Sequence, residues 1–536
     1  MKKCILAIFL FSSFGYCLAC TNFVAGRDAT TDGSIFVSYA ADSYSLYGFL
    51  RYQPAADHAM GEVRKITDWD TGKPLCEIPQ VAHTYSVVGN MNEYQLVIGE
   101  TTYGGREELY GDSGIDYGSL IYIALERCRT AREAIECMTG LAQEYGYASE
   151  GESFSIADTK EVWVMDFIGK GKEEKGAVWV ARRIPDDCVS AHANQARITQ
   201  IDFSDKEHKD WYWADDVVEF ARKKGYYDGK DADFSFSDTY NPLDFLGLYI
   251  CEARVWSFFR QVNQDMDRYL DYVLGKSKER MPLFVKPDRK ISVQDFKNYM
   301  RDQYEGTPLD ITQGTDAGPW HSKLRYGSLG FKLDSVQYWY ERPTATQQTG
   351  WSFVAQIRPA APTHIGGIFW FGVDDTATNL YVPMYCTITD VPECMREGNG
   401  DLYTYSPTSA FWAFNRVANW AYTKYSVMLP EIRKVQQQWE EYFTTIIPAT
   451  DQSAMEMSAD DARSYLTRFS CQQAESSTQA WQKLFEYLLV KYLDGQERKE
   501  ENGKFKRNEW GEPVSPNRPP FPEDFLRKIA PEILHE

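Results

Sequence analysis

The sequence lacks the features that mark several common classes of functional site. Its seven histidines are scattered and form no His-Glu-x-x-His motif, and no Gly-rich stretch has the spacing of a phosphate-binding loop. Positive charge is in deficit, since 57 Lys and Arg stand against 77 Asp and Glu, for a net charge of −20. We therefore expect no bound metal, no cofactor and no nucleic-acid partner.

Long apolar runs are also missing beyond the amino-terminal segment. No later stretch of about 18 apolar residues predicts a transmembrane anchor. The sequence contains no fixed-period repeat and no extended low-complexity tract. With 43% hydrophobic and 15% aromatic residues among 536, the chain instead has the composition of a large folded core.

The amino-terminal segment has the pattern of a secretory signal peptide. Lys2 and Lys3 precede an apolar run over residues 4–14, and small residues suited to cleavage follow around residues 17–19. The run is too short to span a bilayer. We expect residues 1–19 to be removed and the protein to be exported, to a periplasmic or extracellular location.

Removal of residues 1–19 would leave Cys20 as the first residue. A thiol beside a free α-amino group, whose reference pKa is about 7.7 to 8.0, supplies a nucleophile and a base in one residue. Two other interpretations stay open, a lipid anchor attached to Cys20 in a lipid-anchored binding protein and a structural disulfide. Cys17 occupies the position where lipoprotein signals usually carry Leu, which weakens the first of these.

The residues that follow Cys20 predict a β-hairpin. Cys20 to Ala25 has the composition of a strand, Thr31-Asp32-Gly33 that of a turn, and Ser34 to Tyr39 that of the return strand. The hairpin would bring Cys20 and Asp42 into one neighbourhood. This opening resembles that of the C69 dipeptidases, relatives of penicillin V acylase and bile salt hydrolase among the N-terminal-nucleophile hydrolases.

The resemblance continues from residue 20 to about residue 390. Four later segments are similar to segments of that family, and they cover residues 92–104, 191–198, 251–256 and 366–386. The resemblance implies an α+β fold with a four-layer αββα core over residues 20–405.

Three candidate site residues follow from this resemblance. Cys20 is similar to the family's nucleophile, and Asp42 to the carboxylate that holds the N-terminal amine, although an exposed turn-capping acid is the alternative. Asn194 resembles the side chain that helps to bind the oxyanion, whereas an Asn in such a strand is also commonly hydrogen-bonded to its local backbone. A backbone N–H near Thr101 or Thr102 is the expected second donor.

The sequence departs from the family pattern at Tyr39. Relatives often place a basic residue three positions before the acid, where this chain has Tyr39 before Asp42. If that basic residue lowers the thiol pKa, this chain must use another, such as Arg197 or Arg254, or accept a less ionised thiol.

The remaining sequence predicts alternating helices and strands, followed by a helical region. Apolar residues recur at helical spacing over residues 117–145, and residues 153–166 and 177–182 have the pattern of strands. Residues 408–447 and 460–493 predict long helices, and a charged, Pro-rich tail follows residue 497. We expect a helical C-terminal extension over residues 406–536.

Two minor features leave their role open. The mature chain would keep eight cysteines besides Cys20, among which Cys386 and Cys394 are the favoured local disulfide pair, with buried free thiols as the alternative. Asp374 and Asp375 could bind a cation, but acids at a strand end more often cap a turn.

Together these features predict an exported cysteine dipeptidase that acts through a thioester on Cys20. The family implies dipeptides with a free amino end, so a carboxylate should bind that amine, but the sequence does not identify which one. The alternative enzyme is an amide hydrolase of the penicillin V acylase or bile salt hydrolase type. A homo-oligomer is compatible with the sequence, which does not fix the oligomeric state.

Overall fold

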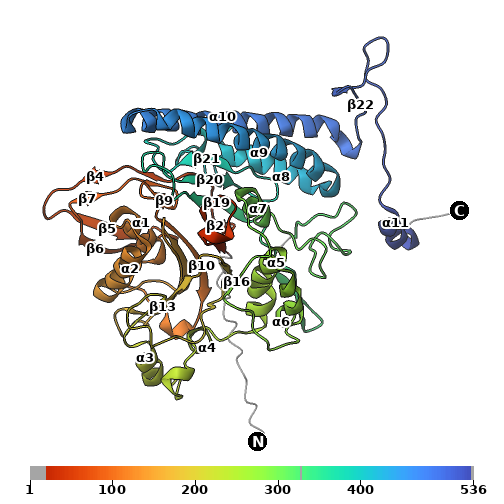
Figure 1. The fold of residues 1–536 in the computed structure, drawn as a ribbon. Helices are drawn as coiled ribbons and strands as arrows, with labels where there is room; N and C mark the ends of the chain where they lie inside the picture. Colours follow the sequence, from red (N-terminus) through yellow and green to blue (C-terminus); the bar gives the residue numbers. More distant parts are fainter. Residues whose placement is uncertain (1–19, 326–328, 533–536) are drawn as a thin grey trace, which may run out of the picture.

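The computed structural model describes residues 20–325 and 329–532 of the chain (Figure 1). The predicted signal peptide, residues 1–19, lies outside the described residues. Within them the chain combines two large antiparallel sheets with α-helices and ends in a helical region, as predicted from the sequence.

The two large sheets contain most of the strands. In spatial order, the first sheet consists of β16 (Phe284–Val285), β14 (Val189–His192), β1 (Thr21–Ala25), β2 (Ile35–Asp42), β19 (Thr349–Ile357), β20 (Ile368–Val373) and β21 (Val382–Tyr385). The second sheet consists of β15 (Trp211–Trp213), β13 (Ala177–Ile184), β12 (Val162–Gly169), β11 (Gly151–Ala157), β10 (Val97–Gly104), β9 (Met91–Asn92), β8 (Val87–Val88) and β3 (Tyr52–Gln53).

Shorter strands pair two by two outside these sheets. The pairs are β4 (Ala56–Asp57) with β7 (His83–Thr84), β5 (Val63–Thr67) with β6 (Pro74–Pro79), β17 (Gly330–Leu333) with β18 (Val336–Trp339), and β22 (Glu500–Glu501) with β23 (Lys504–Phe505).

The α-helices lie mainly between the strands of the first half and after the last strand of the first sheet. They are α1 (Tyr117–Arg127), α2 (Ala131–Tyr145), α3 (Val217–Lys224), α4 (Phe236–Tyr240), α5 (Ala253–Val262), α6 (Leu270–Val273), α7 (Val293–Tyr299), α8 (Ala410–Tyr422), α9 (Tyr425–Met455), α10 (Ala459–Lys491) and α11 (Glu523–Ile529).

The predicted hairpin forms β1 and β2 at the centre of the first sheet. Thr21 lies opposite Ala40, so Cys20, the residue before β1, lies beside the end of β2. At the turn, Asp32 accepts a hydrogen bond from the Ser34 amide at 3.0 Å, and Gly33 has a φ of 74°, which a glycine adopts without steric cost. The register therefore places Cys20 and Asp42 close together.

The two large sheets pack on one another through their central strands. β10 of the second sheet contacts β1 and β2 of the first, and one apolar cluster includes Val37 from β2 and Val97 from β10. A second cluster joins α1 and α2 to the second sheet, for example through Leu120 and Ile156. On the first sheet, α7 contacts β2 and β19, and α8 and α10 contact β20 and β21 (Figure 1).

The long helical patterns are interrupted where polar residues form helix caps. The pattern over residues 117–145 yields two helices, because Thr130 forms a capping box with Glu133 and starts α2. The pattern over residues 408–447 is divided at Lys424, whose φ of −153° is not helical, into α8 and α9. The expected second long helix is α10.

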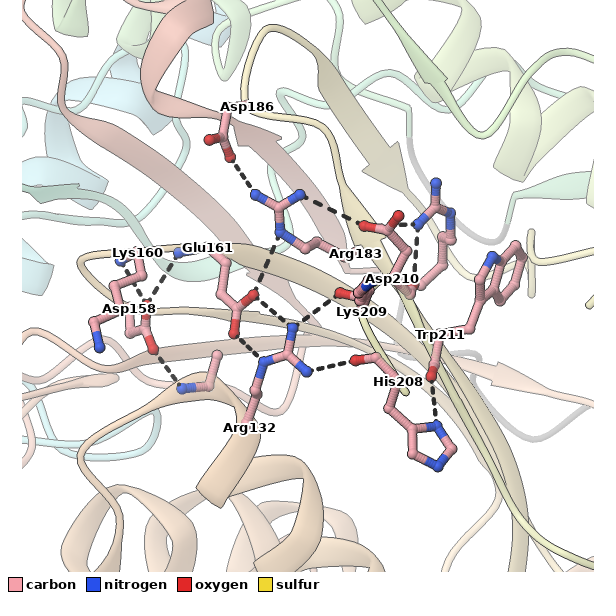
Figure 2. A network of polar contacts seen from close by, with 12 residues as sticks. Arg132, Asp158, Lys160, Glu161, Arg183, Asp186, His208, Lys209, Asp210 and Trp211 are labelled. Atoms are coloured by element: carbon pink, nitrogen blue, oxygen red, sulfur yellow. Dashed lines mark hydrogen bonds and ion pairs between the residues drawn. The ribbon is translucent and has the colours of Figure 1, made fainter. Parts of the chain in front are cut away.

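A polar network holds the loop before β15 against α2 (Figure 2). Arg132 on α2 forms two hydrogen bonds with Glu161, at 2.6 and 3.0 Å, and also donates to the carbonyls of His208 and Lys209. Arg183 Nε lies 3.3 Å from Glu161 Oε2, an oxygen that also accepts from Arg132. A bidentate arginine–carboxylate pair fixes both position and orientation. The network thus anchors the outer edge of the second sheet.

We predict that the C-terminal helices unfold together with the sheets. Trp481 on α10 is fully buried, stacks on Phe414 of α8 at 4.6 Å and donates to the Thr378 carbonyl. Trp481→Ala should lower the free energy of unfolding by about 3 to 5 kcal/mol. Trp510→Ala, at a site 78% exposed, should change it by about 0.5 kcal/mol or less. Denaturant unfolding measures both, and a separate second transition in Trp481→Ala would contradict joint unfolding.

Candidate active site

Cys20 lies immediately before β1 and is almost completely buried, with 2% of its surface exposed. Its Sγ atom is 3.3 Å from the hydroxyl of Tyr39 on β2. That hydroxyl in turn donates a hydrogen bond of 2.5 Å to Glu100 on β10. The thiol is therefore connected to a carboxylate of the second sheet through one tyrosine.

The surroundings of Cys20 favour the neutral thiol. Burial raises the thiol pKa well above its ordinary value, and the negative charges of Glu100 and Asp42 raise it further. The hydrogen bond between the thiol and the Tyr39 hydroxyl acts in the opposite direction. To act as a nucleophile in this arrangement, the sulfur would need a base that removes its proton.

Arg254 at the start of α5 connects the segments around Cys20. Its guanidinium is fully buried. Its hydrogen bonds reach the Cys20 carbonyl (2.7 Å), Thr21 Oγ1 (2.9 Å), the Ala193 carbonyl (3.1 Å), Asn194 Oδ1 (2.9 Å) and the Ile250 carbonyl (3.0 Å). Of the two arginines considered from the sequence, Arg254 is therefore the one that contacts Cys20, and it does so through the backbone carbonyl, whereas the thiol contacts Tyr39.

Arg197, the other arginine considered from the sequence, pairs with Glu252 at 2.8 Å. Its remaining hydrogen bonds go to backbone carbonyls of Ala191, Pro282 and Leu283. Arg197 therefore fixes the region after β14 and is not the partner of the thiol.

Asp42 is buried at the end of β2 and has two partners from later in the chain. Arg342 donates to its Oδ2 at 2.7 Å, and Thr349 donates to its Oδ1 at 2.6 Å. An exposed turn-capping acid is thus the wrong interpretation of Asp42. Its carboxylate is a charged group beside Cys20, with its position fixed by an arginine.

Asn194 follows β14 and has a φ of 62°, in the left-handed region that Asn tolerates better than most residues. Its Nδ2 donates to the Thr102 carbonyl, and its backbone N–H donates to Thr101 Oγ1 at 3.2 Å. Because Arg254 donates to Oδ1, the amide nitrogen is turned toward β10. Asn194 therefore lies between Arg254 and the edge of β10.

The edge of β10 presents backbone groups to this region. The carbonyls of Glu100 and Thr102 accept hydrogen bonds from the side chains of Asn22 and Asn194. The N–H and C=O of one strand residue point to the same edge, and these edges alternate along the strand. The Thr102 N–H therefore faces the side of Asn194, whereas the backbone groups of Thr101 point to the opposite edge, toward β11.

His192 of β14 joins the two sheets beneath Asn194. Its two ring nitrogens lie 2.7 Å from Thr101 Oγ1 and 2.8 Å from Ser155 Oγ. Burial, together with the charge of Arg197, lowers its pKa to about 3, so the ring is neutral near pH 7. No sequence motif points to a role for His192, although its place two residues before Asn194 in a strand was a usable signal.

Two minor predictions can be compared with the structure. Asp375 forms a buried ion pair with Lys323 at 2.5 Å and accepts from the Tyr422 hydroxyl, so it is a structural acid with its own cation. All nine described cysteines are free thiols. The suggested disulfide between Cys386 and Cys394 is therefore absent, and both are buried thiols.

The described part of the chain contains no group of three or more His, Cys, Asp or Glu arranged to hold a metal ion. Among the helices of residues 20–325 and 329–532, none has the length and apolar character needed to cross a membrane. A cavity of about 540 Å³ lies between α7 and α9, but Cys20, Asn194 and Arg254 are not among its lining residues.

Two buried acids near Cys20 were not singled out from the sequence. Burial raises the pKa of Glu100 to about 7, and it raises the pKa of Glu152 on β11 strongly, with the Glu100 charge adding to the effect. The sequence could have pointed to them, because each is the one charged residue in a strand of otherwise apolar or small residues. Such residues are rarely buried without a functional or structural reason.

Replacement of Glu100 by Gln should stabilise the protein at high pH. Because the folded-state pKa of about 7 lies above that of an unfolded Glu, stability falls as pH rises from about 4.5 through 7. Glu100→Gln should remove up to about 3 kcal/mol of this cost at pH 8 and little at pH 4.5. Thermal unfolding at both pH values measures the difference, with exposed Glu107→Gln as control. An equal shift of the melting temperature at the two pH values would disprove this assignment.

Comparison with known proteins identifies a family. The model of Peptidase family C69 matches residues 53–438, a range that includes Asn194 and Arg254 and begins after Cys20 and Asp42. A probable dipeptidase of Salmonella dublin is 26% identical over 409 residues, covering 72% of this chain and 85% of the relative. A probable dipeptidase of Latilactobacillus sakei is 25% identical over 470 residues, covering 84% and 90% respectively. The chain belongs to peptidase family C69.

Proposed function

We propose that the protein is an exported dipeptidase in which Cys20 becomes the N-terminal nucleophile when residues 1–19 are removed. The observation that carries the proposal is the link through Arg254 between the Cys20 carbonyl and the side chain of Asn194, whose amide in turn reaches the Thr102 carbonyl of β10. A nucleophile beside amide donors is the arrangement that acyl transfer requires.

The choice of dipeptides as substrates is supported by the relatives. Proteins that match 72 to 84% of this chain carry the name probable dipeptidase, in Salmonella dublin and Latilactobacillus sakei. A third, probable dipeptidase B of Streptococcus pyogenes serotype M1, is 24% identical over 77% of this chain and 80% of its own length.

In the proposed reaction the α-amine of mature Cys20 is the base. As Sγ attacks the peptide carbonyl carbon, the amine takes the thiol proton, which the buried site otherwise holds on sulfur. The C–N bond then breaks, and the amine returns the proton to the leaving nitrogen. Water hydrolyses the thioester and releases the first amino acid. We assign the role of holding the amine to Asp42, which Arg342 fixes and which neighbours Cys20.

The oxyanion of this reaction is assigned to two donors. Asn194 Nδ2 carries two hydrogens and is oriented by Arg254, and the Thr102 N–H faces the same edge of β10. Donors fixed before the reaction stabilise developing charge without reorganisation, at about 3 to 4 kcal/mol each.

The proposal extends to the fold. The two contacting sheets, with α1 and α2 on one and α7, α8 and α10 on the other, support the four-layer αββα arrangement of N-terminal-nucleophile hydrolases. We place this domain at residues 20–405 and a helical extension at residues 406–536.

Two alternatives considered from the sequence make different predictions. An amide hydrolase of the acylase type would prefer N-acylated amino acids to dipeptides. A lipid-anchored binding protein would carry acyl chains on Cys20 and a blocked amine, which the intact mass of the exported chain would reveal.

We predict that Cys20 and Asn194 variants lose dipeptide hydrolysis. In mature enzyme that begins at residue 20, Cys20→Ser should lower kcat by orders of magnitude, because a hydroxyl ionises far less readily than a thiol. Asn194→Ala should lower kcat by about 100- to 1,000-fold through loss of one oxyanion donor. Asn419→Ala, on the exposed face of α8, is the matched control. Steady-state hydrolysis of a dipeptide panel measures all three, and near-normal turnover in Cys20→Ser would remove Cys20 from the chemistry.

A further inference from the structure

Glu100 and Glu152 lie on the same face of adjacent strands. Glu152 on β11 lies directly opposite Thr102 on β10, and directly opposite residues share a face of the sheet. Thr102 and Glu100 are two residues apart on β10, so their side chains also point to the same face. Both side chains are buried, with 3% and 0% of the residue surface exposed. The two carboxyl groups are thus neighbours inside the protein. Glu100 also contacts the Tyr39 hydroxyl, which lies beside the Cys20 thiol.

Each carboxyl group has one oxygen with a partner and one without. Tyr39 donates to Glu100 Oε1 at 2.5 Å, and Thr102 donates to Glu152 Oε1 at 2.8 Å. Within the described ranges, Glu100 Oε2 and Glu152 Oε2 are buried and have no donor when both acids are ionised. When one of the acids is protonated, the two side chains hydrogen-bond to each other. Buried carboxylate oxygens normally find donors, because leaving them unpaired costs free energy.

A compensating positive charge is missing as well. In the described part of the chain, neither glutamate forms an ion pair with a Lys, Arg or His. The two nearest buried arginines of the site are used elsewhere, since Arg254 holds backbone groups and Arg342 holds Asp42. Two buried carboxylates without a cation share a proton rather than ionise together. A cationic ligand would relieve both deficits.

The position of the pair relative to Cys20 suits one particular cation. Two successive contacts, of 3.3 and 2.5 Å through the Tyr39 hydroxyl, separate Cys20 Sγ from Glu100 Oε1. In an amino acid the α-nitrogen lies roughly 2.5 Å from its own carbonyl carbon. A carbonyl carbon at an attack distance of about 3 to 3.5 Å from Sγ therefore leaves its α-ammonium within reach of Glu100.

We infer that Glu100 and Glu152 together bind the α-ammonium of the substrate's first residue, through the two carboxylate oxygens that lack partners. The inference rests on the proposed dipeptidase function and supplies its specificity. An ammonium carries three donors and a charge, so it can satisfy both oxygens. An N-acylated substrate has neither the charge nor the small size, and it would leave two buried acids uncompensated.

The experiment compares Ala-Leu with propionyl-Leu, which differs only in having hydrogen in place of the ammonium. In mature enzyme, Glu152→Gln should lower kcat/KM for Ala-Leu by about 30-fold or more and leave that for propionyl-Leu unchanged or higher. Glu100→Gln should shift the ratio in the same direction. The rate of Cys20 alkylation by iodoacetamide should stay within threefold of wild type in Glu152→Gln, because Glu152, unlike Glu100, is not among the charges that raise the thiol pKa.

The controls separate substrate binding from effects on the fold or the nucleophile. Glu107→Gln, an exposed glutamate close to β10, should leave both substrates unaffected. Equal losses for both substrates, with slower alkylation, would mean that the acids support Cys20 or its own amine, and would overturn the inference. Ala-Leu turnover within threefold of wild type in both glutamate variants would also overturn it. A wild-type enzyme that hydrolyses no dipeptide would instead reject the proposed function itself.

Discussion

The geometry of the site depends on one buried guanidinium. Arg254 reaches the backbone of Cys20, the carbonyl before Asn194 and the Asn194 side chain, and so joins the start of β1, the end of β14 and α5. An arginine is suited to this because its planar fork offers several donors of fixed direction, all of which a buried site must satisfy. Without Arg254, the proposed nucleophile Cys20 and the proposed oxyanion donor Asn194 would lose the hydrogen-bond partner that they share.

The charge distribution around Cys20 is unusual for a cysteine nucleophile. Positive groups lie near, but Arg254 is engaged with carbonyls and Arg342 with Asp42, while Glu100 and Asp42 oppose ionisation of the thiol. Many reactive thiols are activated by a basic neighbour, which this sequence replaces with Tyr39. The proposed base, the α-amine of mature Cys20, would resolve the difficulty, because it forms only when the preceding peptide bond is cut.

The parts of this structure that were predictable from sequence are those governed by local rules. The turn at Asp32-Gly33 specified the β1–β2 hairpin, and the register then followed from strand alternation, which placed Asp42 beside Cys20. The long C-terminal helices were visible in the spacing of apolar residues, although their division at Lys424 was not. Local patterns thus set the elements and some of their ends.

The rest of the site depends on contacts between distant segments. Arg342 lies 300 residues from its partner Asp42, and no periodicity in either segment indicates the pair. The pairing of Glu152 with Glu100 requires the register of β10 and β11, which only the folded sheet defines. The predicted role of Asn194 came from the family resemblance, because an asparagine after a strand is common and does not by itself indicate a functional site. A single sequence does not indicate which residues far apart in the chain will contact one another.

The measurement that bears most directly on this account is the chemical state of the first residue in the active, exported enzyme. Stoichiometric alkylation followed by peptide mapping should find one label on the thiol of Cys20, in a tryptic peptide that covers residues 20–27 and has a free amino end. Activity should decline in proportion to that label. An active chain that starts at any other residue, or full activity after complete labelling of Cys20, would contradict the mechanism.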